Sequence, residues 1–256
     1  MNSYGLGGKV AVITGGASGI GRACAHVMAR SGADISIWDL DRAAIDVVLN
    51  ELEAFECRTH GAVVDVGDSA AVDAAMDDVV DKLGHVSVVV ANAGIGGEQA
   101  PTGDYTDEGW HKVISINLDG VFYTQRAGIR AMKAGGRGGS VINMASILGA
   151  VGFANSSAYA AAKHGVVGMT QTAAWEHAAD GIRVNAVGPA SSAPRLWSGA
   201  SLRRPSSSWS PNTRYNDSVS PKRSPSWWPG WPATAPRSRP APTTRSTAAT
   251  WPADPG

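Results

Sequence analysis

Short apolar runs alternate with longer segments in which apolar residues recur at helical spacing over the first 189 positions. The short runs predict strands at residues 10–14, 34–39, 60–66, 86–91, 140–145 and 183–187. The longer segments predict helices at residues 20–31, 42–55, 69–83, 107–134 and 157–179. Ser69 is predicted to cap the third helix. This alternation is typical of an α/β protein with a Rossmann-type, doubly wound parallel sheet and right-handed crossovers.

The regular pattern ends at Pro189, where the composition changes. Residues 1–189 carry 13 Lys and Arg and 20 Asp and Glu, a net charge of −7. Residues 190–256 carry 9 Lys and Arg and 2 Asp and Glu, a net charge of +7, so the two parts cancel to the chain's net charge of zero. The second part also holds 12 of the 14 prolines and 6 of the 9 tryptophans, with no Ile, Phe or Met. Such a composition cannot bury a core. We predict a domain at 1–189 and a low-order tail rich in Pro, Ser, Arg and Trp at 190–256.

The turn between the first predicted strand and helix reads TGGASGIG from Thr14 to Gly21. Glycines allow a tight turn and a close approach of pyrophosphate, and the helix start directs free N–H groups at phosphates. The residues expected to contact a dinucleotide are Gly15, Ser18, Gly19, Ile20 and Gly21. A glycine-rich turn alone is weak evidence, but its place at the first strand–helix junction, followed by Asp39, favours a nucleotide site.

Asp39 ends the second predicted strand, 18 residues after Gly21. A carboxylate there can accept hydrogen bonds from the adenosine ribose and would repel a 2′-phosphate. No basic residue stands at positions 17, 18 or 40 to attract that phosphate, so the sequence favours NAD over NADP. The alternative is an ordinary strand-end or helix-capping aspartate.

Two further strand ends suit the same cofactor. Asp65 and Val66 follow the third strand and could hold adenine, the aspartate by a hydrogen bond and the valine by packing. The small residues of Asn92, Ala93 and Gly94 after the fourth strand would let the cofactor lie against the sheet. The alternatives are a turn aspartate and a plain turn, since Asn, Asp and Gly are common turn residues.

The spacing of Tyr159 and Lys163 places both side chains on one face of a helix. An ammonium near a phenol lowers the pKa of the phenol, which can then exchange a proton with an alcohol or carbonyl. Ser146, just past the fifth strand, could hold the substrate oxygen beside the tyrosine. YxxxK alone describes many solvated helix faces, and Asn117, polar in an apolar segment, could be satisfied by a backbone group.

Together these motifs resemble the short-chain dehydrogenase/reductase family over residues 9–189. The matching residues are TGGASGIG, Asp39, Asp65-Val66, Asn92-Ala93-Gly94, Asn117, Ser146, Tyr159, Lys163, Asn185 and Gly188-Pro189. The resemblance implies an NAD-binding catalytic domain that transfers hydride between the nicotinamide and a secondary alcohol or ketone.

The resemblance also implies a role for each matching residue. Tyr159 would be the general acid/base and Ser146 the substrate stabiliser. Lys163 would lower the tyrosine pKa and, with Tyr159, contact the cofactor, which Pro189 also borders. Asn117 would hold a water that passes the proton to solvent. Apart from the resemblance, four apolar residues after Ser146 would make a wall that favours an apolar or cyclic substrate over a polyol; they are Ile147, Leu148, Val151 and Phe153. The alternative is simple loop packing, and the sequence does not decide between the two.

The tail after Pro189 lacks the family's covering segment, last strand and oligomer-forming end. We shifted the reading frame one base earlier and asked which residues the possible codons would then encode. The shifted frame permits three segments like those of the family's C-terminal region, at residues 189–197, 220–234 and 239–252. We therefore predict that residues 190–256 are a frameshifted translation, caused by loss of one base near the codons for Gly188 and Pro189. The chain as written would then be unstable, poorly oligomeric and weakly active or inactive, and a homotetramer is expected only with an intact C-terminus.

A basic, tryptophan-containing arm that binds nucleic acid is the disfavoured alternative for the tail. A dinucleotide-binding protein without catalysis is the alternative for the domain. The two cysteines, Cys24 and Cys57, form no metal-ligand or disulfide pattern, and no run is long enough to span a membrane. The sequence thus predicts a cytoplasmic protein without a metal site.

Overall fold

The computed structural model describes residues 4–189, so the predicted tail, its frameshift and the alternative basic arm lie outside the described residues. The described residues form six strands: β1 (Val10–Thr14), β2 (Asp34–Asp39), β3 (Thr59–Val63), β4 (Val86–Ala91), β5 (Gly139–Met144) and β6 (Ile182–Val187). The α-helices are α1 (Gly19–Arg30), α2 (Arg42–Leu52), α3 (Ser69–Leu83), α4 (Asp107–Ile114), α5 (Gly120–Gly135) and α6 (Ser157–His177). No helix within these residues has the length and apolarity needed to cross a bilayer.

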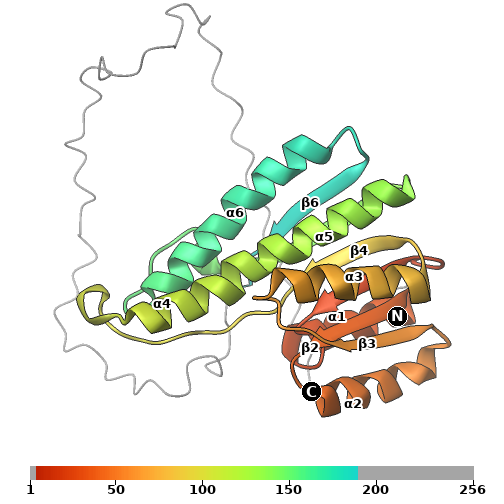
Figure 1. The fold of residues 1–256 in the computed structure, drawn as a ribbon, viewed down its shortest axis with the longest axis horizontal. Helices are drawn as coiled ribbons and strands as arrows, with labels where there is room; N and C mark the ends of the chain where they lie inside the picture. Colours follow the sequence, from red (N-terminus) through yellow and green to blue (C-terminus); the bar gives the residue numbers. More distant parts are fainter. Residues whose placement is uncertain (1–3, 190–256) are drawn as a thin grey trace, which may run out of the picture. The chain divides into compact units, whose positions relative to one another are not determined.

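The strands form one parallel sheet in the order β3-β2-β1-β4-β5-β6 (Figure 1). The doubly wound α/β fold predicted from the sequence is therefore confirmed. The order reverses direction between β1 and β4, and the crevice at such a switch point is where ligands of open α/β sheets bind. The predicted glycine-rich turn follows β1, and Asn92 follows β4, so these two segments lie on either side of that point.

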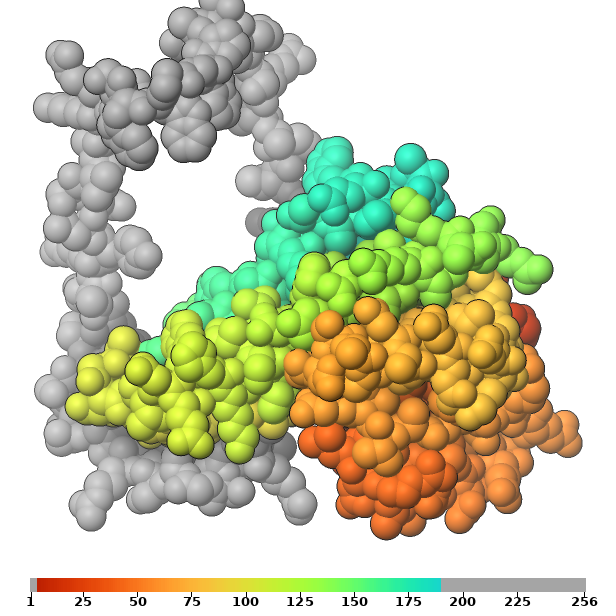
Figure 2. All heavy atoms as spheres, viewed as in Figure 1, coloured from red at the N-terminus to blue at the C-terminus, as the bar shows by residue number. Residues whose placement is uncertain are grey.

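The two faces of the sheet are covered unequally. Side chains of α3, α5 and α6 pack on one face in a core that includes Val12, Val89 and Val141, and Figure 2 shows these helices in successive rows. Helices α1 and α2 pack on the other face, over β1 and β2. Within residues 4–189, β6 has a strand beside it only on the β5 side, and four of its six residues are exposed.

Several predicted boundaries differ from the observed ones. The third strand ends at Val63 rather than at residue 66, so Asp65 and Val66 lie in the loop beyond it. Ser69 is the first residue of α3, and Asp68 is the cap, with its carboxylate accepting from the backbone N–H groups of Ala70 and Ala71. An aspartate in extended conformation before a helix suits this role as well as serine does.

The long helix predicted at 107–134 is interrupted by one wider turn. Between α4 and α5, the segment η3 (Ser115–Asp119) is a π-helix, and Gly120 N–H bonds to the Ser115 carbonyl five residues earlier. The second predicted helix likewise ends at Leu52 and continues as a 3₁₀ turn, η1 (Glu53–Phe55). Apolar periodicity does not distinguish these turns from α-helix, because the pattern of buried positions shifts by only one residue.

Candidate active site

The glycine-rich turn after β1 is held tightly from behind. A Cβ on Gly21 would lie 2.2 Å from the Gly15 carbonyl oxygen and 2.7 Å from Asn92 Nδ2, so only glycine fits at position 21. Asn92 Nδ2 donates to the carbonyls of Thr14 (2.9 Å) and Gly15 (3.1 Å). The structure thus gives Asn92 a supporting role for the turn, and contact with a cofactor stays a prediction.

The sequence analysis included Thr14 in the glycine-rich motif but gave it no role. In the structure Thr14 connects the end of β1 to the end of β4. Its hydroxyl accepts from the backbone N–H groups of Asn92 (2.9 Å) and Ala93 (3.0 Å), and the residue is 1% exposed. A polar residue at the end of an otherwise apolar strand was the available signal.

The start of α1 is open to an anion. Ser18 is the N-cap residue, but its side chain makes no capping hydrogen bond, and the first turn carries no acidic residue. Ser18, Gly19 and Ile20 are exposed, and a Cβ on Gly19 would meet nothing within 4 Å. Free N–H groups at a helix N-terminus with space in front of them suit a pyrophosphate.

Asp39 is placed to hold a ribose at the end of β2. One carboxylate oxygen accepts from Ala17 N–H (3.1 Å) and the other from Leu40 N–H (2.8 Å). Each oxygen accepts only one of these bonds and so keeps capacity for a further donor. Asp39 therefore ties the glycine-rich turn to β2 and can still accept from two hydroxyl groups. Together with the α1 cradle, it fits a dinucleotide whose ribose carries no phosphate.

The remaining predicted adenine and cofactor contacts have structural roles of their own. Asp65 is exposed and accepts from Gly67 N–H (2.8 Å), as a turn aspartate does, and its contact with adenine stays a prediction. Val66 is 7% exposed and belongs to the core, where a Cβ on Gly120 would approach its Cγ2 to 2.7 Å. Gly94 packs closely on Asn117, so a side chain at position 94 would displace the Asn117 amide.

Lys163 and Tyr159 lie one turn apart near the start of α6, with Lys163 Nζ 5.5 Å from the centre of the tyrosine ring. Lys163 is 3% exposed and donates to the Met144 carbonyl at the end of β5 (2.7 Å). Burial lowers the pKa of Lys163 from 10.5 to about 8. The structure thus places a buried ammonium beside a half-buried phenol, in a site of low dielectric.

Ser146 lies on a turn that packs directly against the same helix. It follows β5 and caps the 3₁₀ turn η4 (Ile147–Gly149), where its hydroxyl accepts from Leu148 N–H (3.2 Å). A Cβ on Gly149 would lie 2.9 Å from the Lys163 carbonyl, so glycine allows the turn to contact α6. The hydroxyl, the phenol and the ammonium are therefore carried by two segments in contact.

Asn117 is fully buried in the π-helical turn, and both polar atoms of its side chain bind Ile95. Its Oδ1 accepts from Ile95 N–H (2.9 Å) and its Nδ2 donates to the Ile95 carbonyl (2.7 Å). The observed arrangement is the satisfied asparagine considered as the alternative above. It fixes the chain that follows Gly94, and a catalytic water at Asn117 stays a prediction.

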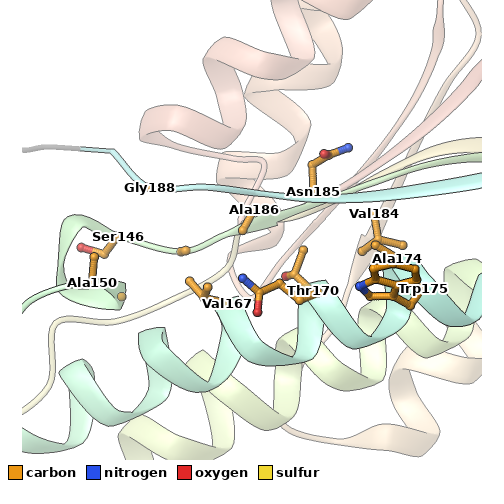
Figure 3. Close-up of a pocket in the computed structure, with 13 residues that line it drawn as sticks. Ser146, Ala150, Val167, Thr170, Ala174, Trp175, Val184, Asn185, Ala186 and Gly188 are labelled. Carbon is orange, nitrogen blue, oxygen red and sulfur yellow. The ribbon is translucent and has the colours of Figure 1, made fainter. Parts of the chain in front are cut away.

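A groove of about 480 Å³ runs between α6 and β6. Figure 3 shows Ser146 at one end of it and Trp175 at the other, with Thr170 of α6 between them. Pro189, the last described residue, borders this region, because its carbonyl accepts from Ile147 N–H (3.3 Å). The groove therefore leads from the predicted substrate-holding serine along the outer edge of the sheet.

The apolar residues that follow Ser146 divide into two groups. Ile147, Val151 and Phe153 are 47%, 49% and 56% exposed, so these side chains lie at the surface rather than in the core. Leu148 is 7% exposed, which agrees with the alternative of loop packing and not with a place in a substrate wall. A 3₁₀ turn points successive side chains in different directions, which the run of apolar letters does not reveal.

Replacing Lys163 with methionine is expected to stabilise the native state at neutral pH by up to about 3 kcal/mol, the free energy equivalent of a pKa lowered from 10.5 to about 8. At neutral pH the native protein bears the full cost of burying the ammonium. As the pH rises from about 8 to about 10.5, the native state releases the proton before the unfolded chain does, so the free energy of unfolding rises.

Urea unfolding at both ends of this range would measure the effect. The wild-type chain should gain stability with pH in this window, relative to Lys163→Met. Lys112→Met, which removes an exposed lysine of α4, is the matched control and should not differ from wild type. Equal stability of Lys163→Met and wild type at both pH values would contradict the assignment of a costly buried ammonium.

Comparison with known proteins agrees with this geometry. The family profile described as "short chain dehydrogenase" matches residues 9–201. Cis-4-hydroxycyclohexanecarboxylate dehydrogenase of Sinomonas cyclohexanicum is 45% identical over 184 residues, which cover 71% of this chain and 72% of the relative. Cyclohexanol dehydrogenase of Acinetobacter sp. (strain SE19) is 39% identical over 181 residues, with the same coverage.

Solved structures show the same likeness. The crystal structure of carveol dehydrogenase from Mycobacterium avium in complex with NAD matches with a TM-score of 0.71 and 36% identity, over 72% of this chain and 71% of that one. Levodione reductase matches with a TM-score of 0.69 and 39% identity over the same shares. With the glycine-rich turn, Asp39, and the Tyr159–Lys163 pair beside Ser146 in place, the chain belongs to the short-chain dehydrogenase family.

Proposed function

We propose that this protein is an NAD-dependent oxidoreductase that interconverts secondary alcohols and ketones, with a preference for apolar or cyclic substrates. The observation that carries the proposal is the buried ammonium of Lys163 beside the Tyr159 phenol, on a helix packed against the turn of Ser146. A dinucleotide cradle in the same domain supplies the second requirement of hydride chemistry.

The cofactor bound in this cradle supplies hydride transfer to or from the substrate carbon. The chain's own residues manage the proton and the substrate oxygen. The Tyr159 phenolate accepts the hydroxyl proton of an alcohol, and in the reverse direction the phenol donates a proton to the carbonyl oxygen. The Ser146 hydroxyl donates to the same oxygen. Lys163 places a positive charge beside the phenolate, and a water held at Asn117 would carry the proton onward.

The choice of NAD follows from Asp39. A 2′-phosphate would bring negative charge next to its carboxylate, while Leu40 and Ser18 offer no compensating cation. One solved relative contains NAD, and another is titled NAD⁺-bound xylitol dehydrogenase.

Asp39→Ala is expected to weaken NADH binding by about tenfold to a hundredfold, the effect of losing charge-assisted hydrogen bonds. NADPH binding should weaken less or improve, because the repulsion is also lost. Asp39→Asn keeps an acceptor without the charge, so its affinity for NADH should lie between those of the wild type and Asp39→Ala. Titration of cofactor fluorescence measures all three proteins. An unchanged NADH-to-NADPH preference in Asp39→Ala would contradict the role of this carboxylate.

The substrate class rests on the exposed apolar side chains of Ile147, Val151 and Phe153 near Ser146. Several relatives are named for cyclic alcohols or ketones, including cyclohexanol dehydrogenase and levodione reductase. The direct test measures NADH formation with cyclohexanol and NADH consumption with cyclohexanone, against xylitol as a polyol. Turnover of xylitol with no turnover of either cyclic compound would overturn the substrate class.

The state of the C-terminal region is a separate part of the proposal. The alignments to the relatives leave more than a quarter of each one's length unmatched, since they cover 72% of it. We infer that residues 190–256 are translated out of frame, so that the chain as written is a weakened enzyme. Sequencing the source DNA across codons 185–256 tests this, because the native frame would show one additional base near Pro189.

The alternative for the tail is a genuine basic arm with net charge +7. Such an arm would give DNA binding that weakens steeply with salt and disappears when residues 190–256 are deleted. DNA that encodes the tail as written, together with this binding, would favour the arm over the frameshift.

A further inference from the structure

A buried polar cluster lies between β5 and helices α5 and α6, and the proposed mechanism does not use it. Its members are Gln125 of α5, Asn143 of β5 and Thr170 of α6, which are 4%, 0% and 5% exposed. Asn143 Nδ2 donates to Gln125 Oε1 (2.6 Å) and to Thr170 Oγ1 (2.9 Å). One amide group thus joins the strand to both helices.

Thr170 fixes the orientation of this amide. Its hydroxyl donates its only proton to the Val166 carbonyl (2.6 Å), so toward Asn143 its oxygen can only accept. Asn143 must therefore direct its NH₂ group at Thr170 and Gln125. Its Oδ1 is buried and has no hydrogen-bond partner among residues 4–189. An unpartnered buried acceptor is unfavourable, so an apolar residue would suit stability alone at least as well.

The cluster lies directly beside the group that holds the catalytic lysine. The residue after Asn143 is Met144, whose carbonyl accepts from Lys163 Nζ. Thr170 follows Lys163 by seven residues, which is two turns of the same face of α6. Two hydrogen bonds therefore connect the end of β5 to α6: Asn143 to Thr170, and Lys163 to the Met144 carbonyl. The turn that Ser146 caps follows directly after β5.

We propose that Asn143 and Thr170 are positioning residues, whose hydrogen bond sets the end of β5 against α6 and so holds the Met144 carbonyl where it fixes the Lys163 ammonium beside Tyr159. Only the expected effect on turnover rests on the proposed function. The positions of β5, α6 and Lys163 can be tested on the folded protein without substrate.

Thr170→Val and Thr170→Ser form the decisive pair, since valine keeps the shape without the acceptor and serine keeps the hydroxyl. The full chain contains six lysines, so labelling lysine with ¹³C at Cε gives few NMR signals, and Lys163→Met identifies that of Lys163. The pKa of Lys163 should move by about one unit in Thr170→Val, upward if water enters or downward if the Met144 carbonyl is lost. Thr170→Ser should keep the wild-type value.

Three further proteins separate positioning from general stability. Thr172→Val removes a threonine hydroxyl from an exposed site of the same helix, where it bonds only to the Gly168 carbonyl, and should leave the Lys163 titration unchanged. Asn143→Leu removes the amide together with its unpartnered oxygen but leaves Gln125 Oε1 without its donor. Its melting temperature should therefore fall no further than that of Gln125→Leu, which loses the same hydrogen bond, while the pKa of Lys163 moves only in Asn143→Leu. A change in the Lys163 titration at equal loss of stability is not expected from a residue that only fills the core.

Turnover gives the second reading. In an active form of the enzyme, Thr170→Val should lower kcat by about tenfold and shift the pH profile of kcat/KM, with a smaller change in NADH affinity and with recovery in Thr170→Ser. An unaltered Lys163 titration in both Thr170→Val and Asn143→Leu would overturn the inference. Failure of every form to oxidise alcohols, with the titration moved as expected, would instead count against the proposed function and leave the positioning role supported.

Discussion

Replacing Tyr159 with phenylalanine is expected to lower kcat by about a thousandfold, while NADH binds with nearly unchanged affinity. The substitution removes only the phenol oxygen, and general acid–base catalysis by a positioned group contributes about 10²–10⁴ to the rate. The cofactor cradle at α1 and Asp39 lies on other elements and stays intact. Steady-state turnover and a fluorescence titration with NADH, measured on the same preparations, would separate the two effects.

Tyr4→Phe is the matched control, because Tyr4 is 63% exposed and no part of the proposed site. It should leave both turnover and cofactor binding at wild-type values. Retention of turnover in Tyr159→Phe would show that another group moves the proton. Loss of NADH binding in that variant would show instead that the phenol is needed to form the cofactor site, and the two proposed roles would then have to be reassigned.

Restoring the reading frame near codon 189 is expected to raise kcat/KM by at least about a hundredfold over the chain as written, the scale of a lost preorganised contact at an active site. Within residues 4–189, the outer edge of β6 has no partner strand, and Val187 and Trp175 are 47% and 86% exposed. An unpaired edge promotes aggregation, and a nicotinamide site open to water weakens every electrostatic contact within it.

The restored protein should also have a higher melting temperature and should form a homotetramer, as the family resemblance implies. Activity, thermal unfolding and light scattering of the two proteins, each verified by intact mass, provide the comparison. Ordinary dehydrogenase turnover by the chain as written would refute the view that its C-terminal region disables it. If the source DNA encodes residues 190–256 as given in the sequence, the low activity would be a property of the natural protein.

The sequence by itself determined the order and type of the elements and the chemistry at the strand ends. Short apolar runs placed the bounds of β1, β2, β4, β5 and β6 within one residue, because the interior strands of a parallel sheet are rich in apolar residues. The glycine-rich turn could be recognised from the sequence because only glycine fits at position 21. The Tyr159–Lys163 pair could be recognised because four residues make about one helical turn.

Only the tertiary structure decided which groups those residues meet. Asn92 binds Gly15 across 77 residues of sequence, Asn143 binds Thr170 across 27, and the π-turn places Asn117 against Ile95. Periodicity reports which face of an element is buried, but a hydrogen-bond partner depends on how two elements pack. Local spacing therefore predicted the groups that we propose react, whereas the contacts that hold them in place arise from the packing of β5, α5 and α6.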